Sequence, residues 1–451
     1  MKEQQMSFNL PSYNKDEKTD GLYTGKPRIN SPIRSQVEFK MFCLEDLVPA
    51  EHKVRFVWNY VKQLNMSKFL EKIQSVAGNA GRSATDPRLL LALWIYATIE
   101  GIGSGRVIET YCTDHNAFKW LCGNVPINYH TLTDFRSSNK ELLDDLLTQS
   151  VAVFLNQGLI SLERIAQDGI RVRASAGSAS FRRKETLEEH YAIAKAFVQQ
   201  LIKEQESSPK EIVDRKKSEE LRLAKQKENC LKQALEQLEL LKKKKEEAKK
   251  KQHKHLTEQE KKNMRASPTD PESRKMKMAN GGFSPAYNVQ MATDTKTQVI
   301  VGLSVNNAGS DIGQMSPMYE QVKERYSEWK VEPNDWLVDG GYNENAEIEK
   351  MKKMNPNSTV YMPPKNSQLP ESYLPKQGDS EVIKEWRINM GTIEAKNIYK
   401  ERAATAECVN ATARNRGLQQ FSVRGLTKVT SVMLIFAITH NLMRAMHLFG
   451  C

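Results

Sequence analysis

Two aspartates lie where a predicted strand meets a glycine, and their carboxylates are the first groups in the chain suited to chemistry. Asp339 follows the short apolar run 336–338 and precedes two glycines, which is typical of a buried strand that ends in a turn. Asp168 also precedes a glycine, within the alternating segment 165–172, as in a strand. Asp339 either serves a site at the sheet edge or only accepts hydrogen bonds from its turn amides.

A third carboxylate, Glu407, lies in a predicted helix over residues 393–414. Helical spacing places Tyr399 and Arg414 within about a quarter-turn of Glu407, with Arg402 on the other flank. A lone glutamate on a helix is usually solvated. The alanines and the cysteine around Glu407 instead favour an inward position and a partner.

Three further arginines are candidate phosphate contacts. Arg171 and Arg173 follow the first aspartate on one side of the extended chain, where they either reach a phosphate or flank an ordinary acid. Segment 124–138, preceded by residues 103–122, resembles the second helix of a helix-turn-helix. Its candidate outward residues are Tyr129, His130, Thr131, Thr133 and Arg136. Polar residues at this place are equally typical of an ordinary helix cap, so contact with DNA stays an alternative.

The composition limits the partners of these groups. With 451 residues the chain has room for two or three domains. Its net charge of +12 favours a polyanionic partner, which is a nucleic acid, a membrane surface or an acidic protein. Six scattered cysteines without a C-x-x-C pair fit neither a disulfide scaffold nor a zinc knuckle, and indicate a reducing cytoplasm.

Export and membrane insertion are not expected. The N-terminal residues carry no apolar segment typical of export, and the most hydrophobic run, 429–439, is too short to span a bilayer. We therefore expect a soluble cytoplasmic protein without a membrane partner. Residues 1–40 are polar and rich in proline and glycine, which predicts a loosely ordered arm with a short strand at 36–39.

The remaining chain divides into a helical domain, a sheet and an insertion. Residues 41–160 carry apolar residues at helical spacing. Residues 181–265 are dense in lysine and glutamate. Apolar residues spaced by four and three on both sides of a break at 206–209 predict an antiparallel coiled hairpin. The lysine-rich stretch 242–255 favours a solvated face over nucleic-acid contact. The hairpin extends either a DNA-binding surface or a dimer contact.

The catalytic candidates fall in the third part, residues 161–180 and 266–451. A strand before the insertion is followed by a predicted hairpin, 287–291 and 298–305, whose Asp294 favours a turn role. Helices at 311–325 and 344–354 then alternate with strands at 336–339 and 358–362. This order predicts an α/β fold with a ribonuclease-H-like mixed sheet and flanking helices, preceded by an all-α domain and interrupted by the helical hairpin.

The sequence resembles the DDE transposases of bacterial insertion sequences, in the subgroup with a helical N-terminal domain and a charged helical insert. The resemblance rests on the segments QDG, YNVQMATD and LVDGGY, and on Y-x-x-R followed by Glu407 and a basic residue. It implies that Asp168, Asp339 and Glu407 bind two divalent ions, Mg²⁺ with Mn²⁺ as a substitute. Tyr399 and Arg402 match the family. Arg414 stands where the family usually has a phosphate-contacting lysine.

The implied function is DNA transposition. Three clustered carboxylates suit hard divalent cations that activate a nucleophile and stabilise the leaving oxygen of a phosphodiester. The expected partners are double-stranded DNA, as element ends and as target, and a second copy of the chain in a homodimer, at the nucleoid of the cytoplasm. A metal-dependent nuclease and a non-catalytic DNA-binding coiled-coil protein are the alternatives.

Overall fold

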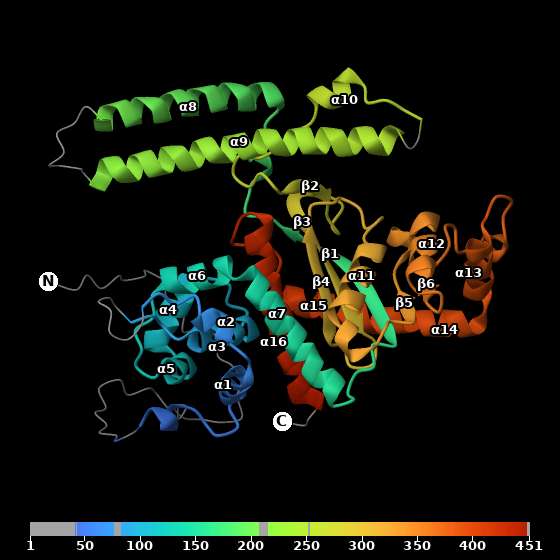
Figure 1. Ribbon diagram of the computed structural model, residues 1–451, viewed down its shortest axis with the longest axis horizontal. Coiled ribbons are helices and arrows are strands. Elements are labelled where there is room, and N and C mark those ends of the chain that lie inside the picture. Colours follow the sequence, from blue (N-terminus) through green and yellow to red (C-terminus); the bar gives the residue numbers. More distant parts are fainter. Residues whose placement is uncertain (1–40, 42, 76–82, 207–214, 251–252, 449–451) are drawn as a thin grey trace, which may run out of the picture. The chain divides into compact units, whose positions relative to one another are not determined.

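The computed structural model (Figure 1) describes residues 41, 43–75, 83–206, 215–250 and 253–448. The predicted arm 1–40, with its strand at 36–39, lies outside the described residues. The elements below all lie within one compact unit, Leu44–Cys451.

The N-terminal part of this unit is helical, as predicted. Asp86 caps the third helix by accepting a hydrogen bond from the amide of Arg88, and Pro87 occupies its first turn, which is the start signal that the sequence carries. The elements are η1 (Leu44–Leu47), α1 (Lys53–Gln63), α2 (Ser67–Leu70), α3 (Pro87–Ile99), α4 (Gly105–Asp114), α5 (Asn116–Cys122), α6 (Tyr129–Ser138) and α7 (Lys140–Asn156).

The sheet has the mixed topology that a ribonuclease-H-like fold requires. Its central strand β1 (Arg164–Arg173) pairs antiparallel with β3 (Phe283–Asp294) and parallel with β5 (Asp335–Leu337). The outer strands are β6 (Thr359–Tyr361), parallel to β5, and the antiparallel neighbours of β3, which are β2 (Arg274–Lys277) and β4 (Ile300–Asn306). Strand β2 is absent from the sequence-based prediction. Asp294 forms the predicted turn, since its carboxylate accepts hydrogen bonds from the amide and hydroxyl of Thr297.

Helices of the C-terminal half surround the sheet. They are α11 (Met315–Arg325), α12 (Asn345–Met354), α13 (Glu381–Gly391), α14 (Ile393–Arg402), α15 (Cys408–Asn415) and α16 (Leu426–Leu448). Short helical turns are η2 (Ser178–Ser180), η3 (Ser327–Trp329), η4 (Gly340–Tyr342), η5 (Pro370–Tyr373) and η6 (Ala403–Glu407). Two predictions are wrong here. The helix predicted from residue 311 begins at Met315, and the helix predicted over 393–414 is interrupted by η6, which is a π-helical turn.

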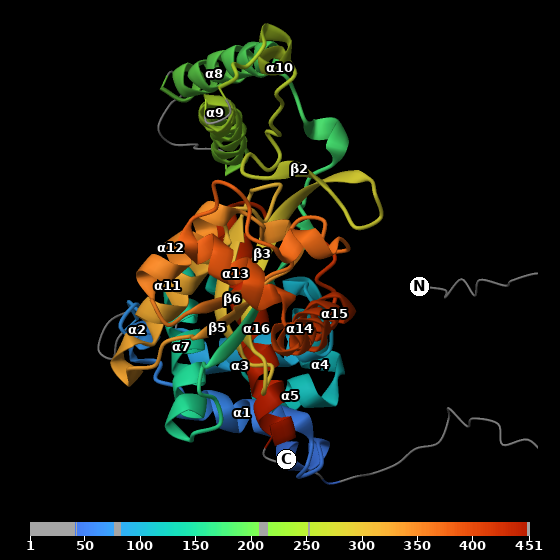
Figure 2. The ribbon, with the colours of Figure 1, turned by 90° about the vertical axis from the view of Figure 1, so that its right-hand side faces the viewer.

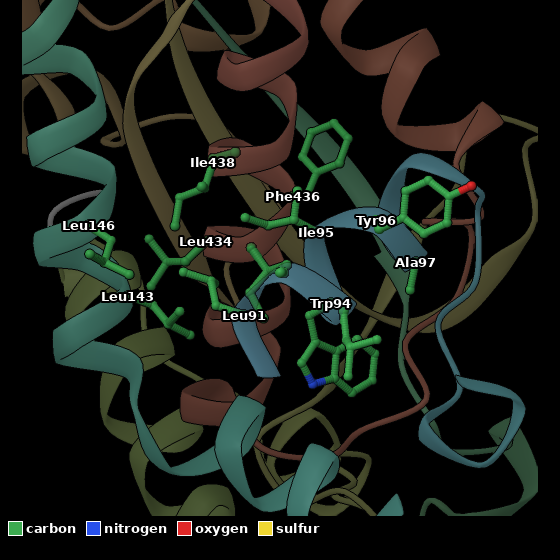
Figure 3. Packing of buried hydrophobic residues seen from close by; sticks show 14 of the residues in the cluster. Leu91, Trp94, Ile95, Tyr96, Ala97, Leu143, Leu146, Leu434, Phe436 and Ile438 are labelled. Carbon is green, nitrogen blue, oxygen red and sulfur yellow. The ribbon is translucent and has the colours of Figure 1, made fainter. Parts of the chain in front are cut away.

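Helix α16 joins the helical part to the sheet in one hydrophobic core. Leu434, Phe436 and Ile438 meet residues of α3 and α7 such as Leu91 and Leu143 (Figure 3). The same cluster continues to residues of β1, β3 and β4. By length and composition α16 passes the test for a membrane span among the described residues, but 67% of its apolar window is buried. It packs against α3, α6, α7 and β4, which is the situation of a core helix.

The insertion is a helical hairpin with its own apolar contacts. Helices α8 (Lys184–Glu206) and α9 (Arg215–Lys250) run side by side (Figures 1 and 2), followed by the short α10 (Glu258–Lys262). Residues from α8 and α9 form two clusters separate from the cores of the sheet; they are Leu187, Ala194, Leu231, Ala234 and Leu238, and then Val198, Leu201 and Ala224. Backbone hydrogen bonds between Arg182 and Ala266 close the base of the insertion.

Candidate functional site

The register of the sheet places the two predicted aspartates side by side. Strands β1 and β5 are parallel, and Ala166 of β1 pairs with Leu337 of β5. Asp168 and Asp339 each lie two residues beyond this pair. Because parallel strands run in the same direction, equal offsets bring both residues to the same edge of the sheet.

The carboxylate of Asp168 is largely enclosed. Its Oδ1 accepts a hydrogen bond from the amide of Gly169, and its Oδ2 accepts one from Nδ2 of Asn410, both at 2.9 Å. The Arg402 guanidinium lies 3.5 Å from Oδ2. Burial raises the pKa of Asp168 to about 6; Arg402 acts to lower this pKa, and the charge of Asp339 acts to raise it. The two aspartates are therefore close enough to repel each other when ionised.

Asp339 holds the glycine turn and takes part in the acidic pair at the same time. Its Oδ1 accepts a hydrogen bond of 2.8 Å from the amide of Gly341, at the start of η4. This is the turn role left open by the sequence. The role in the turn and the role in a site at the sheet edge do not exclude each other, because a carboxylate has a second oxygen and several lone pairs.

The π-helical turn η6 changes the face presented by the third candidate carboxylate. A π-turn takes up one residue more than an α-turn, so everything after it is rotated by about 100° relative to a continuous α-helix. In a continuous α-helix five residues would span about 140° around the helix axis, and with the π-turn they span about 80°. They are Tyr399, Arg402, Glu407, Asn410 and Arg414. Two of these residues, Arg402 and Asn410, contact Asp168.

Glu407 lies between these two contacts along the helix, but its side chain is exposed, so the prediction that it faces inward is wrong. Among the described residues no group of three acidic, histidine or cysteine side chains is arranged to hold a metal ion. The structure therefore brings together Asp168 and Asp339, and leaves Glu407 on the adjoining helical face without joining them.

A buried polar network adjoins Asp168 and Asp339, and the sequence analysis did not predict it. Oδ1 of Asp311 accepts hydrogen bonds of 2.7 Å from the side-chain amides of Asn288 and Gln290. The hydroxyl of Tyr342, at the end of η4, donates to Oε1 of Gln290. The network thus ties the turn that follows Asp339 to strand β3. The signal that could have found it is the pair of polar side chains, 288 and 290, on one face of a strand that is otherwise apolar.

The glycine after Asp168 is required by this network. A Cβ atom on Gly169 would lie 2.4 Å from Nε2 of Gln290 and 2.5 Å from Oδ1 of Asp311. Both distances are shorter than non-bonded contacts allow, so any side chain at this position displaces the network. Two residues of the segment QDG are therefore explained. The glycine is required by packing on one face of β1, and the aspartate supplies the carboxylate on the other face.

The predicted basic residues fall into two groups. Arg171 donates hydrogen bonds to the carbonyls of Lys277 and Gly309, and it lies 3.6 Å from Asp311. It therefore flanks an acid and links the end of β2 to the segment that contains Gly309. Arg173 and Arg414 are exposed. Tyr399 is half-buried beside Arg402; burial raises its pKa, and Arg402 acts to lower it.

The prediction that Arg136 faces outward from α6 is wrong. Its side chain is buried, with the guanidinium 3.9 Å from the centre of the Trp94 ring and a hydrogen bond of 3.0 Å to the carbonyl of Gly103. Burial lowers the pKa of Arg136 to about 10. The predicted cap of α6 is confirmed, because Asn128 accepts a hydrogen bond from the amide of His130. On the same helix His130 is exposed.

Two segments of the chain match known protein families. The family described as transposase domain (DUF772) matches residues 42–138. The family described as transposase DDE domain matches residues 373–446, the segment that carries α14, η6, α15 and α16. Both matches support a DDE transposase. Searches of the curated proteins and of the solved structures found no match. Four of the candidate residues, Tyr399, Arg402, Glu407 and Arg414, lie inside the matched DDE segment.

Proposed function

We propose that this transposase binds the ends of a mobile DNA element, hydrolyses a phosphodiester there to expose a 3′-hydroxyl, and joins that hydroxyl to target DNA. The observation that supports the proposal best is the pairing of Asp168 with Asp339 at one edge of the sheet, under a helix whose π-turn gathers Arg402, Glu407 and Asn410 on one face. DNA at the nucleoid is then its partner, in keeping with the net charge of +12.

The donor set fits hard divalent cations. Asp168 and Asp339 supply anionic oxygens, which suit Mg²⁺ and Mn²⁺. A bound cation would relieve the mutual repulsion of the two carboxylates. Ions held there would activate a nucleophile and stabilise the leaving oxygen. We propose Glu407 as the third ligand because it lies between the two residues that already contact Asp168.

The other side chains around the site have distinct roles in this proposal. Asn410 fixes the orientation of the Asp168 carboxylate through its hydrogen bond to Oδ2. Arg402 offsets the negative charge of the pair and orients the scissile phosphate, while the exposed Arg173 and Arg414 contact phosphates further along the DNA. Arg171 links the end of β2 to Gly309, which precedes Asp311 of the polar network by two residues.

The proposal is tested by incubating the full chain with duplex DNA that carries the ends of its own element, in Mg²⁺ or Mn²⁺. Transposition requires nicks at the element termini, 3′-hydroxyl products, and joining of these products to a target plasmid. Nicks without joining would leave only the metal-dependent nuclease. End binding without cleavage in either metal would favour the non-catalytic DNA-binding alternative.

Binding of Mg²⁺ should depend on pH through Asp168. Its pKa is raised to about 6, so the carboxylate is ionised above this pH and protonated below it. Because a proton competes with the metal, we expect the Mg²⁺ affinity to be about 10-fold lower at pH 5 than at pH 7 and to level off above pH 7. Calorimetric titration between pH 5 and pH 8 measures this change. An affinity that does not vary with pH over this range would contradict the role of Asp168.

A further inference from the structure

A small cavity lies where the helical part of the chain meets the segment 416–422, which joins α15 to α16. It has a volume of about 60 Å³. Trp94 of α3 and Phe436 of α16, both labelled in Figure 3, belong to its apolar wall. Two arginines, Arg136 of α6 and Arg416, also line it, and its described lining residues include no aspartate or glutamate. The cavity therefore carries positive charge without an acid to match it.

Arg136 is buried without an acidic partner. Its side chain is 5% exposed. Burial lowers its pKa to about 10, and no charged neighbour in the described part of the chain contributes to this shift. The guanidinium therefore remains charged at neutral pH. Such a charge is costly to bury unless a group of opposite sign lies close to it.

Arg416 is half-buried and is in a similar position. Burial lowers its pKa, and the charge of Glu100 acts to raise it. Glu100, however, forms its own ion pair with Lys53, at 2.5 Å. Within the described ranges Arg416 has no carboxylate at ion-pair distance, so it does not offset the charge of Arg136 but adds to it.

Other enclosed arginines of this chain show the usual pairing. The side chain of Arg325 is 6% exposed and lies 2.6 Å from Asp144. The side chain of Arg387 is 10% exposed and lies 2.7 Å from Asp379. Arg136 departs from this arrangement, which indicates that its counter-ion comes from outside the described residues.

The unbonded edges of the two guanidinium groups suit a phosphate. Arg136 donates through Nη1 to the carbonyl of Gly103, at 3.0 Å. Arg416 donates through Nη1 to the carbonyl of Ile99, at 2.6 Å. Among the described residues, Nε of both arginines is buried and has no hydrogen-bond partner. Nε and Nη2 form the edge of a guanidinium that holds an oxyanion through two parallel hydrogen bonds.

The size of the cavity agrees with this chemistry. A water molecule needs about 10–15 Å³ of such volume. A cavity of about 60 Å³ therefore has room for a group with the four oxygens of a phosphate, and it is too small for a nucleobase with its sugar.

We propose that this cavity binds a phosphate group against the Nε edge of Arg136, with Arg416 as a second positive charge at the same cavity. The bound anion neutralises the buried charge and strengthens the junction between α6 and the segment that follows α15. Helix α15 carries Asn410, the hydrogen-bond donor to Asp168, so this junction supports the helix that adjoins the acidic pair.

The phosphate comes either from solution or from the DNA backbone. Gln420, which lines the cavity, is the backbone neighbour of the exposed Arg173. The DNA source rests on the proposed function, because Arg173 belongs to the proposed DNA surface. A free phosphate ion needs neither DNA nor metal, and in that case the site stands apart from transposition.

The test is calorimetric titration of the full chain with inorganic phosphate, without DNA or metal, in a chloride buffer of fixed ionic strength. Arg136→Gln and Arg416→Gln should each lower the phosphate affinity by about 10-fold or more, because each removes a cation and keeps a polar side chain. Arg387→Gln is the buried control, since its acid is part of the chain. Arg414→Gln is the exposed control. Both controls should keep the affinity of the wild type.

A second readout is the melting temperature. Phosphate should raise it in the wild type and in both controls, but not in the two cavity variants. Circular dichroism verifies that each variant is folded, and if Arg136→Gln does not fold, the less buried Arg416→Gln carries the test. A wild-type chain that binds no phosphate, cavity variants with unchanged affinity, or an equal loss in either control would overturn the proposal.

Repeating the titration with a saturating DNA duplex distinguishes the two sources. Displacement of inorganic phosphate by the duplex identifies a backbone phosphate as the occupant. Phosphate binding that the duplex leaves unchanged identifies a free ion. Both results support the site, and neither depends on whether the chain cleaves DNA, so a failure of the proposed transposition chemistry would be seen separately.

Discussion

Asp168→Asn and Asp339→Asn should each lower the rate of Mg²⁺-dependent cleavage of element ends by about 10³-fold or more. The substitution removes one anionic metal ligand and almost no volume, and a metal ion contributes several kcal/mol to stabilising the transition state. Binding of uncut ends should be retained, because the rest of the DNA surface is unchanged. Nicking in single-turnover assays, at pH 8 with Mg²⁺ and with Mn²⁺, measures the loss.

Glu344→Gln is the control for these variants. Glu344 is an exposed carboxylate that follows the same glycine turn as Asp339, and its neutralisation should change the cleavage rate by no more than about 2-fold. Glu407→Gln should reach the same loss as the two aspartate variants if the helix supplies the third ligand. A cleavage rate near that of the wild type in any one of the three would remove that residue from the proposed site.

Arg402→Ala and Arg414→Ala should separate the positioning of DNA from the binding of metal. Both variants should keep Mg²⁺ binding at pH 8 and slow the joining of pre-cut ends. The slope of log affinity for the ends against log salt concentration should become shallower, by the amount that about one lost phosphate contact produces. Arg402→Ala should have the larger effect, about 10²-fold on joining, because its guanidinium lies against Asp168 and its side chain is only 13% exposed. Arg414→Lys should be mild, since a charged phosphate contact remains.

The alternative is that these arginines only stabilise the protein. In that case the alanine variants would lower the melting temperature and leave the slope of end binding against salt concentration unchanged. Both quantities are measured on the same preparations. A second readout is specific to Arg402: its removal should move the midpoint of the pH dependence of Mg²⁺ binding upward, because the arginine acts to lower the pKa of Asp168. Arg414→Ala should leave this midpoint in place.

Local patterns in the sequence predicted those parts of the site that depend on a single element. The positions of Asp168 and Asp339 at the ends of strands follow from apolar runs and glycines, which act over a few residues. The hairpin follows from the spacing of apolar residues by four and three. The π-turn could not be predicted in this way, because η6 adds one residue to a segment whose composition is that of an ordinary helix.

The missed residues depend on contacts between distant segments. Asn410 lies 242 residues from Asp168, and Asp311 stands in a loop that a continuous helical pattern conceals. A lone arginine is usually exposed, so the sequence predicts an outward position for Arg136. In the structure its guanidinium instead lies over the Trp94 ring and donates a hydrogen bond to a backbone carbonyl 33 residues away. No pattern within α6 specifies those partners.

The closed base of the insertion bears on the order in which the chain can fold. Arg173 and Ala286 are paired neighbours in β1 and β3, yet more than about 100 residues separate them, and such a distant pairing is slow to form when the intervening chain is flexible. The hairpin forms from local helical contacts, and the backbone bridge between Arg182 and Ala266 then joins its two ends. Once it has formed, only two short connections remain to be ordered before the central strands can meet, so the insertion shortens the search for the sheet that it interrupts.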